Sequence, residues 1–400
     1  MAEPALSLEN LFTPEFIADP YPTYRYLREH HPVMRLPGTD LWALTRWDDI
    51  QAGLKEKQLG HSDSEESLAE IERNAAFKSL SNTMLLKNPP DHMRLRGLVA
   101  KTFTARRLES MRTRIRAIAN ELIDAMIEST HGDLVLGFTH PLPVIVICDL
   151  LGIPESDRSR FTEGSQVSGR IIDPTPMSDE ELADANQRTL ESNAYFEALC
   201  EERRLHPQDD LITALVQSET EHGKLSKEEL TANISLLFGA GHETTVNLMG
   251  NALLALYRNR SQLELLKSDL SRMPNAVEEF LRYDSSVQLT ARNTLAEVDV
   301  GCERIPKGHE VLFLLGAANR DPEVFEEPDR LDITRKDVKP MSFGGGIHLC
   351  LGAPLARMEA AEALPVLLTR LPELELDEID NPTWKQTITL RGPADLPAHW

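Results

Sequence analysis

Several features that would assign a protein class at once are scarce or missing in this sequence. It contains only four cysteines, Cys148, Cys200, Cys302 and Cys350, and no two of them form a C-x-x-C pair. Structural zinc sites and iron–sulfur clusters depend on such closely spaced cysteines, so neither is supported. A reducing compartment would leave all four thiols free.

Long apolar runs and an excess of positive charge are also missing. No run approaches the roughly 18 apolar residues that cross a bilayer, and residues 1–16 lack a basic segment followed by an apolar one. We therefore expect a cytoplasmic protein without a membrane anchor. With 42 Lys and Arg against 64 Asp and Glu, the net charge is -22, which argues against partners such as nucleic acid or anionic membrane surfaces.

The overall composition is that of an ordinary globular protein. Of the 400 residues, 41% are hydrophobic and 26% are charged, which permits a large core. Because no flexible linker, internal repeat or low-complexity tract interrupts the chain, we expect residues 1–400 to form a single domain, and we expect a monomer.

The hydrophobic patterns predict a mainly α fold with a smaller β-rich portion. Helices are expected at about 21–30, 91–103, 106–130, 178–205 and 226–258. Short strands are expected near residues 33–47 and again after Asp284, where strands alternate with turns. A last helix begins near Ala353, and Pro365 should kink or end it.

The longest of these helices has an unusual centre. Ser226 and Glu229 form a capping box at its start, and its length of roughly 50 Å requires that it cross the core. Its middle, "FGAGHETT", contains glycines and threonines, which are poor helix formers. This centre is either a close helix crossing or a groove in which Glu243 and Thr244 face a ligand and deliver protons to it.

Two groups of charged residues have helical spacing. Arg282 follows Glu279 by three residues, which allows an ion pair that is either exposed or buried among apolar neighbours. His92 and Arg96 lie four apart on one helix face, which indicates either an anion site or a solvated basic surface.

The stretch "SFGGGIHLCLG" places Cys350 among glycines and beside a histidine. A glycine-rich turn that buries a small apolar thiol is one interpretation. The other is a backbone that lies flat against a large group while one sulfur binds it.

Several motifs together resemble those of the bacterial cytochrome P-450 family. "FGGGIHLCLG" is similar to its haem-binding pattern, "AGHETT" to its oxygen-activating motif and "EFLR" to its E-x-x-R pair, and "PDRL" supplies an arginine. The residues that carry these matches are Phe343, Gly346, Cys350, Gly352, Ala240, Gly241, Glu243, Thr244, Glu279, Arg282 and Arg330. The resemblance covers nearly the whole chain, in the family's motif order.

The resemblance implies a haem (heme b, iron protoporphyrin IX) between the long central helix and the helix after the cysteine loop. Cys350 would be the axial thiolate, which favours O–O bond cleavage. The resemblance implies further haem contacts and structural residues. His92, Arg96, Arg292 and His348 would bind the propionates, Phe343 would pack on the thiolate side, Ala240 would lie over the haem, and Arg330 would join Glu279 and Arg282.

The same resemblance implies a monooxygenase that inserts one oxygen atom of O2 into a hydrophobic small molecule, by hydroxylation or epoxidation. The alternatives are a peroxide-driven peroxygenase and a haem-binding sensor without turnover. The presence of Glu243 and Thr244 argues against both, because neither alternative needs proton delivery. The resemblance also suggests substrate-pocket residues, namely Met84, Leu237, Ala240, Val287, Leu289, Thr290, Ile388 and Thr389.

The segment 92–116 reverses the acidic character of the chain. It contains eight basic residues opposed only by Glu109. Bacterial members of the family take electrons from small acidic ferredoxins, and a basic surface would steer such a partner. We therefore expect a ferredoxin-type redox partner to dock near residues 92–116.

Overall fold

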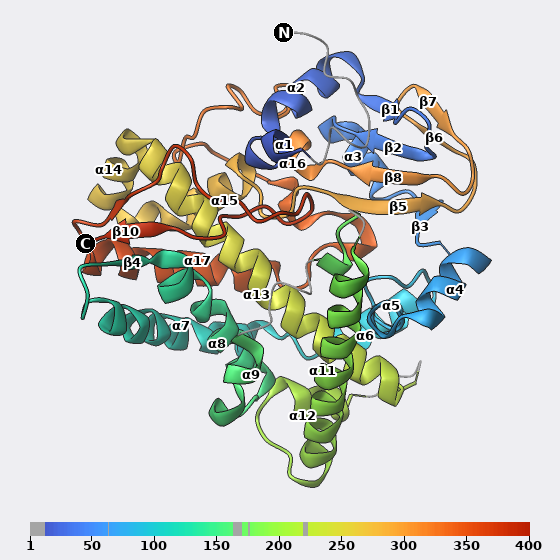
Figure 1. The fold of residues 1–400 in the computed structure, drawn as a ribbon, viewed down its shortest axis with the longest axis horizontal. Helices are drawn as coiled ribbons and strands as arrows, with labels where there is room; N and C mark the ends of the chain where they lie inside the picture. The colour runs from blue at the N-terminus through green and yellow to red at the C-terminus, as the bar shows by residue number, and fades with distance from the viewer. Residues whose placement is uncertain (1–12, 63, 163–169, 175–176, 219–222) are drawn as a thin grey trace.

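The computed structural model describes residues 13–62, 64–162, 170–174, 177–218 and 223–400. Most of this part of the chain is helical, and most of the strands gather at the upper right of the molecule, while β4 and β10 lie at the left (Figure 1). The mainly α fold with a smaller β portion is thus confirmed. Within the described ranges, none of the helices combines the length and apolar character that crossing a membrane requires.

Helices make up most of the first 283 residues. They are α1 (Pro14–Ala18), α2 (Tyr21–His30), α3 (Trp47–Gly53), α4 (Glu65–Arg73), α5 (Ala75–Ser81), α6 (Asp91–Ala100), α7 (Ala105–Met126), a π-helical turn (Val135–Thr139), α8 (Pro141–Leu151), α9 (Ser159–Thr162), α11 (Asp179–Leu205), α12 (Leu211–Val216), α13 (Lys227–Arg258), α14 (Arg260–Ser268) and α15 (Met273–Tyr283). Two more follow, α16 (Leu315–Ala318) and α17 (Ala353–Arg370).

The main sheet combines strands from both ends of the sequence. Its order is β1-β2-β8-β5-β3, formed by β1 (Val33–Arg35), β2 (Leu41–Leu44), β8 (Glu310–Phe313), β5 (Thr290–Thr294) and β3 (Leu59–Gly60). The remaining strands form a hairpin of β6 (Val298–Val300) with β7 (Glu303–Ile305), and a small sheet of β4 (His131–Asp133), β10 (Pro397–His399) and β9 (Glu375–Leu376).

Helix α13 crosses the middle of the molecule, as its length predicted (Figure 1). The predicted capping box is present, since the Glu229 amide donates to Ser226 Oγ over 3.1 Å and the Ser226 amide donates to Glu229 Oε2 over 2.8 Å. It packs against the neighbouring helices α8, α11, α15 and α17, and its second half is almost entirely buried. This helix therefore anchors the largest apolar core.

Pro365 does not end or shorten the last helix. Helix α17 continues past Pro365 to Arg370, and Leu364, Leu367 and Leu368 on either side of it are buried. A proline removes one backbone hydrogen bond. Burial of the apolar face against α7 and α15 outweighs that loss, so the expected end of the helix at Pro365 is wrong.

Candidate functional site

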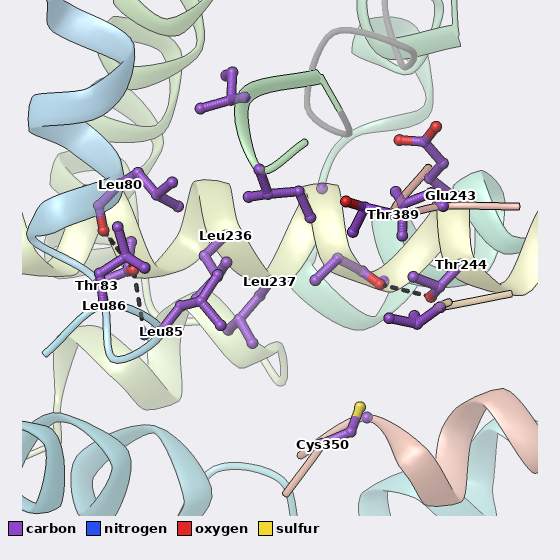
Figure 2. A pocket seen from close by; sticks show the side chains of 18 of the residues that line it. Leu80, Thr83, Leu85, Leu86, Leu236, Leu237, Glu243, Thr244, Cys350 and Thr389 are labelled. Carbon is purple, nitrogen blue, oxygen red and sulfur yellow. Dashed lines mark hydrogen bonds between the residues drawn. The ribbon is translucent and has the colours of Figure 1, made fainter. Parts of the chain in front are cut away.

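A cavity of about 970 Å³ lies between the middle of α13 and the loop that carries Cys350 (Figure 2). Its wall contains most of the residues predicted for the substrate pocket, namely Met84, Leu237, Ala240, Val287, Leu289, Thr290 and Thr389. Ile388 is the exception. Its side chain packs into a separate apolar cluster with Phe16 and Tyr24. The chain bends at Ile388 and Thr389, and the amides of both residues donate to Asp173 Oδ2. The assignment of Ile388 to the pocket wall is therefore corrected.

The Cys350 loop is shaped by short turns and by one tight contact. The Cys350 amide donates to the Phe343 carbonyl over 3.0 Å. Gly346 has φ +62°, and a Cβ atom there would lie 2.0 Å from the Leu54 carbonyl oxygen. Glycine is required at this position because the loop packs on the end of α3.

The Cys350 sulfur faces the cavity (Figure 2), in surroundings that contain several partners for a negative charge. Burial raises the pKa of the Cys350 thiol, whereas the backbone N–H groups of Gly352 and Ala353 and the cations of Arg96 and Arg357 lower that pKa. The Arg357 guanidinium lies 4.4 Å from the centre of the Phe343 ring. These donors suit a thiolate ligand at the start of α17.

Four predicted cationic side chains from distant parts of the sequence meet at one edge of the cavity. His92 and His348 have ring centroids 4.3 Å apart, and Arg96, Arg292 and His348 line the cavity. Burial, followed by the positive charges of Arg292, His92, His61 and Arg96, lowers the pKa of His348 to about 2. Burial also lowers the pKa of Arg292 to about 10.

This basic cluster is well suited to an anionic ligand. Both ring nitrogens of the buried His92 have no hydrogen-bond partner among the described residues. Within the same described ranges, no carboxylate is found against Arg96, Arg292 or His348. A group that carries carboxylates and has a flat face toward Cys350 would satisfy these donors, and the propionates of haem fit this description.

The sequence did not single out His61, which joins this cluster. Its ring lies edge-on to His348 with centroids 5.4 Å apart, and it lines the cavity. In the sequence it is an isolated histidine after a two-residue strand, so no spacing pattern pointed to it. Only the pairing of β3 with β5 brings it beside Arg292.

The E-x-x-R pair is fully buried. Arg282 donates from Nε and Nη2 to the two carboxylate oxygens of Glu279 over 2.7 Å, and both side chains have 0% exposure. This settles the question that the spacing left open between an exposed and a buried pair.

Arg330 is not the third charged member of this pair. Its guanidinium is 59% exposed and pairs with Glu327 and Asp332. Arg335 takes the position instead, with Nε 3.4 Å from Glu279 Oε2 and 13% exposure. Arg330 contributes only its backbone carbonyl, which accepts a hydrogen bond from Arg282. The chain turns between the two arginines, and this turn decides which side chain points inward.

Glu243 and Thr244 point to different sides of α13. Thr244 is on the side that faces Cys350, whereas Glu243 points away (Figure 2). The Thr244 hydroxyl donates to the Ala240 carbonyl one turn earlier over 3.1 Å. Glu243 is 4% exposed, and its Oε1 lies 3.7 Å from Lys385 Nζ. Both residues line the cavity wall, but the Glu243 carboxylate and the Thr244 hydroxyl lie on different sides of α13 and not beside each other.

The glycines of this helix have a separate structural explanation. A Cβ atom on Gly241 would lie 3.0 Å from side-chain atoms of Ile147 on α8. The helix itself is uninterrupted over its length. Gly241 therefore serves a close helix crossing, whereas Thr244, but not Glu243, is on the side of the helix that faces Cys350.

Comparisons with known proteins agree with this geometry. The model of the cytochrome P450 family matches residues 179–390. The cytochrome P450 monooxygenase PikC of Streptomyces venezuelae is 38% identical, with 96% of this chain and 92% of that protein covered. The vitamin D(3) 25-hydroxylase of Pseudonocardia autotrophica is 39% identical, with 97% of this chain and 95% of that protein covered.

A solved structure is similar over almost the entire chain. P450BioI in complex with acyl carrier protein ligated to hexadec-9Z-enoic acid has a TM-score of 0.90 and 35% sequence identity, covering 96% of this chain and 99% of that chain. The family binds haem through a cysteine thiolate, as the donor set around the cavity requires. The chain belongs to the cytochrome P450 family and is a haem-dependent monooxygenase.

Proposed function

We propose that this monooxygenase inserts one oxygen atom of O2 into an apolar small molecule held between α13 and the Cys350 loop. The observation that carries the proposal is the placement of Cys350 and Thr244 on facing walls of one cavity (Figure 2). The side chains around the space are largely apolar, which favours a hydrophobic substrate. Two of the names above refer to hydrophobic molecules of different shapes, vitamin D(3) and hexadec-9Z-enoic acid, so the pocket is proposed to take this broad class.

The haem is proposed to be held by residues at three places in the chain. Cys350 would supply its thiolate ligand, while His92, Arg96, Arg292 and His348 would hold its propionates and Phe343 would pack beside the thiolate. When bound, the haem supplies the activation of O2 and the acceptance of electrons. The two arginines and the two histidines would orient the haem, and the N–H groups at the start of α17 would stabilise the negative charge of the sulfur.

Proton transfer is assigned to α13. The Thr244 hydroxyl faces the Cys350 side of the cavity, where it can donate a hydrogen bond to a ligand in place of the one that it donates to the Ala240 carbonyl. Glu243 and Lys385 form the adjoining buried ion pair, which can hold a proton in reserve behind the helix. Ala240 leaves space on the same wall, since its side chain is a single methyl group.

The alternatives remain a peroxide-driven enzyme and a haem-binding sensor. A cavity with Thr244 on its wall and a buried acid behind it supports the oxygen-dependent reaction, because only that reaction needs protons from this side. The test is product formation from a panel of apolar compounds with NADPH, ferredoxin reductase and ferredoxin, compared with hydrogen peroxide alone. Product with peroxide only, or no product in both, would favour the second or third function.

The electron donor is proposed to be a ferredoxin-type protein that docks on the Cys350 side. Most of the basic residues of segment 92–116 are already in ion pairs, since Arg94, Arg107, Arg112, Arg114 and Arg116 contact acidic side chains. Lys101 and Arg106 are exposed, and no carboxylate partner is found for either within the described residues. The docking surface is therefore narrower than the sequence suggested.

Exposed apolar residues on α6 and just before Cys350 support docking on this side. Met93 is 66% exposed, Leu349 49% and Ile347 47%, and Arg96 on α6 donates to the Leu349 carbonyl. An interface with a small apolar centre and a charged rim is typical of a transient protein complex. As a separate point, we propose that residues 1–400 form a single domain.

A further inference from the structure

His61 is held in place by its backbone, beside the cationic edge of the cavity. It follows β3, whose Gly60 pairs with Asn293 of β5, so that His61 comes next to Arg292 in the sheet. The His61 amide donates to Asn88 Oδ1 over 2.9 Å, and Asn88 Nδ2 donates to the His61 carbonyl over 2.8 Å. A side chain at Gly60 would collide with Asn88, since a Cβ atom there would lie 2.5 Å from Asn88 Oδ1.

The next residue is fixed as well. The Ser62 amide donates to Asn293 Oδ1 over 3.0 Å. Two asparagines, one from the loop before α6 and one from the sheet, therefore fix the backbone on both sides of His61. Such a clamp restricts where the imidazole can point.

The imidazole has one satisfied nitrogen and one without a partner. The backbone of Leu85 is hydrogen-bonded to the ring, whereas the buried Nε2 atom has no partner among the described residues. Burial and the charges of Arg292 and His92 lower the pKa of His61 to about 3. A buried polar atom without a partner costs about 1–3 kcal/mol, so a ligand at this point of the cavity would be favoured.

We propose that His61 is a fifth basic group at the carboxylate edge of the haem, with Nε2 directed at a propionate. One proton is shared between the two groups, either on the imidazole facing a carboxylate or on the acid facing a neutral imidazole. Through Asn88, the same contact ties the loop before α6, which includes the pocket residues Met84 and Leu85, to the position of the cofactor. His61 acts here as a positioning residue.

The test compares haem release and reduction potential in holoenzyme variants. His61→Phe keeps a flat ring against His348 but removes both nitrogens. Transfer of haem to excess apomyoglobin should become faster on the order of tenfold, as expected for loss of one charge-assisted hydrogen bond. The midpoint potential of the iron should fall, because the propionate keeps more of its negative charge.

Three further variants make the outcome decisive. His61→Gln retains an N–H donor and should restore most of the parent values, and it also serves if His61→Phe fails to fold. His92→Phe should accelerate release, as a positive control. His131→Phe, at an exposed position on β4, should change neither quantity. Parent-like release from His61→Phe, or faster release with an unchanged potential, would overturn the proposal and leave His61 with a packing role only.

Discussion

Lys385 Nζ lies 3.7 Å from Glu243 Oε1, on the side of α13 that faces away from Cys350. Both side chains are nearly buried, with 11% and 5% exposure, and burial lowers the pKa of Lys385 while Glu243 opposes this shift. The C-terminal segment therefore supplies a cation to the buried acid of the central helix. This contact joins two parts of the chain that sequence patterns did not connect.

Replacement of Lys385 by Met should weaken both stability and proton delivery. The change removes the ammonium group from beside a buried carboxylate, which should lower the free energy of unfolding by about 1–3 kcal/mol. Fewer electrons should reach product, because Glu243 would be less well positioned to accept and pass on protons. Thermal unfolding and the ratio of product to NADPH consumed measure the two effects. Lys385→Arg keeps the charge and should stay close to the parent in both.

Thr244→Ala should uncouple NADPH consumption from product formation without loss of haem or of substrate binding. The Thr244 hydroxyl is the polar group that α13 presents toward Cys350 (Figure 2), whereas the helix is held by contacts elsewhere. We expect parent-like haem content and ligand affinity, slower product formation and more hydrogen peroxide released per NADPH. Thr245→Ala, at the buried neighbouring position, serves as the comparison. Equal coupling in the parent and Thr244→Ala would remove Thr244 from the proton path.

Gly346→Ala should destabilise the Cys350 loop far more than Gly344→Ala. Both glycines have positive φ, +62° and +67°, but only at Gly346 would a Cβ atom meet the Leu54 carbonyl, at 2.0 Å. Backbone strain costs on the order of 1–3 kcal/mol at such positions, including Gly344 with ψ -145°, and the collision should add to this and raise the loss at Gly346 above about 3 kcal/mol. Unfolding midpoints and haem content report the difference. Equal losses in the two variants would mean that the loop can move off α3.

Much of the site could be predicted from the sequence because its residues occur in compact motifs. Cys350, Glu279 and Arg282 were found in this way, and the capping box and length of α13 were readable from local chemistry. These features depend on neighbours within one or two turns. Which arginine, Arg330 or Arg335, lies beside Glu279 depends on how an irregular loop turns. The sequence separation of five residues does not predict that turn.

Other parts of the site depend on contacts between distant segments. His61 reaches the cationic edge only through the β3–β5 pairing, and Ile388 turns away from the cavity because Thr389 takes the inward position. Glu243 and Thr244 project about 100° apart because they are neighbours on an α-helix, and the packing of α13 against α8, where Gly241 meets Ile147, decides that Thr244 is the one that faces Cys350. The number of free cations in segment 92–116 was overestimated, since their acidic partners come from other helices.

Glu359 gives a prediction for the pH dependence of stability. It is 1% exposed on α17 and its Oε2 atom has no partner among the described residues, and burial raises its pKa well above the ordinary value of 4.5. Between that value and the raised one, the folded protein keeps a proton that the unfolded chain releases. Stability contributed by this site therefore falls as the pH rises above 4.5.

Glu359→Gln should remove this dependence. Relative to the parent, the variant should gain stability as the pH rises from 4.5 to 8, by on the order of 1 kcal/mol. Thermal unfolding of both holoproteins across this range measures the difference, and Glu303→Gln at an exposed position on β7 corrects for the loss of one charge. A constant difference between parent and Glu359→Gln at all pH values would contradict the prediction.

The proposed docking surface is tested best at Lys101 and Arg106. Reversal of Arg112 would be a poor test, because Arg112 pairs with Glu362, which is 7% exposed, and its loss would disturb the packing of α7 on α17. Lys101→Glu combined with Arg106→Glu changes only exposed charge and should slow reduction by an acidic ferredoxin roughly tenfold at low salt. The difference should shrink at high salt, since exposed charges are screened beyond about 8–10 Å at physiological ionic strength. Stopped-flow reduction measured from 20 to 500 mM salt gives both results, with substrate affinity as the internal control.

Lys307→Glu with Lys336→Glu makes the same change in net charge elsewhere and should leave the rate near that of the parent. Equal slowing by both pairs would show that net charge, and not a surface near α6 and α7, controls the encounter.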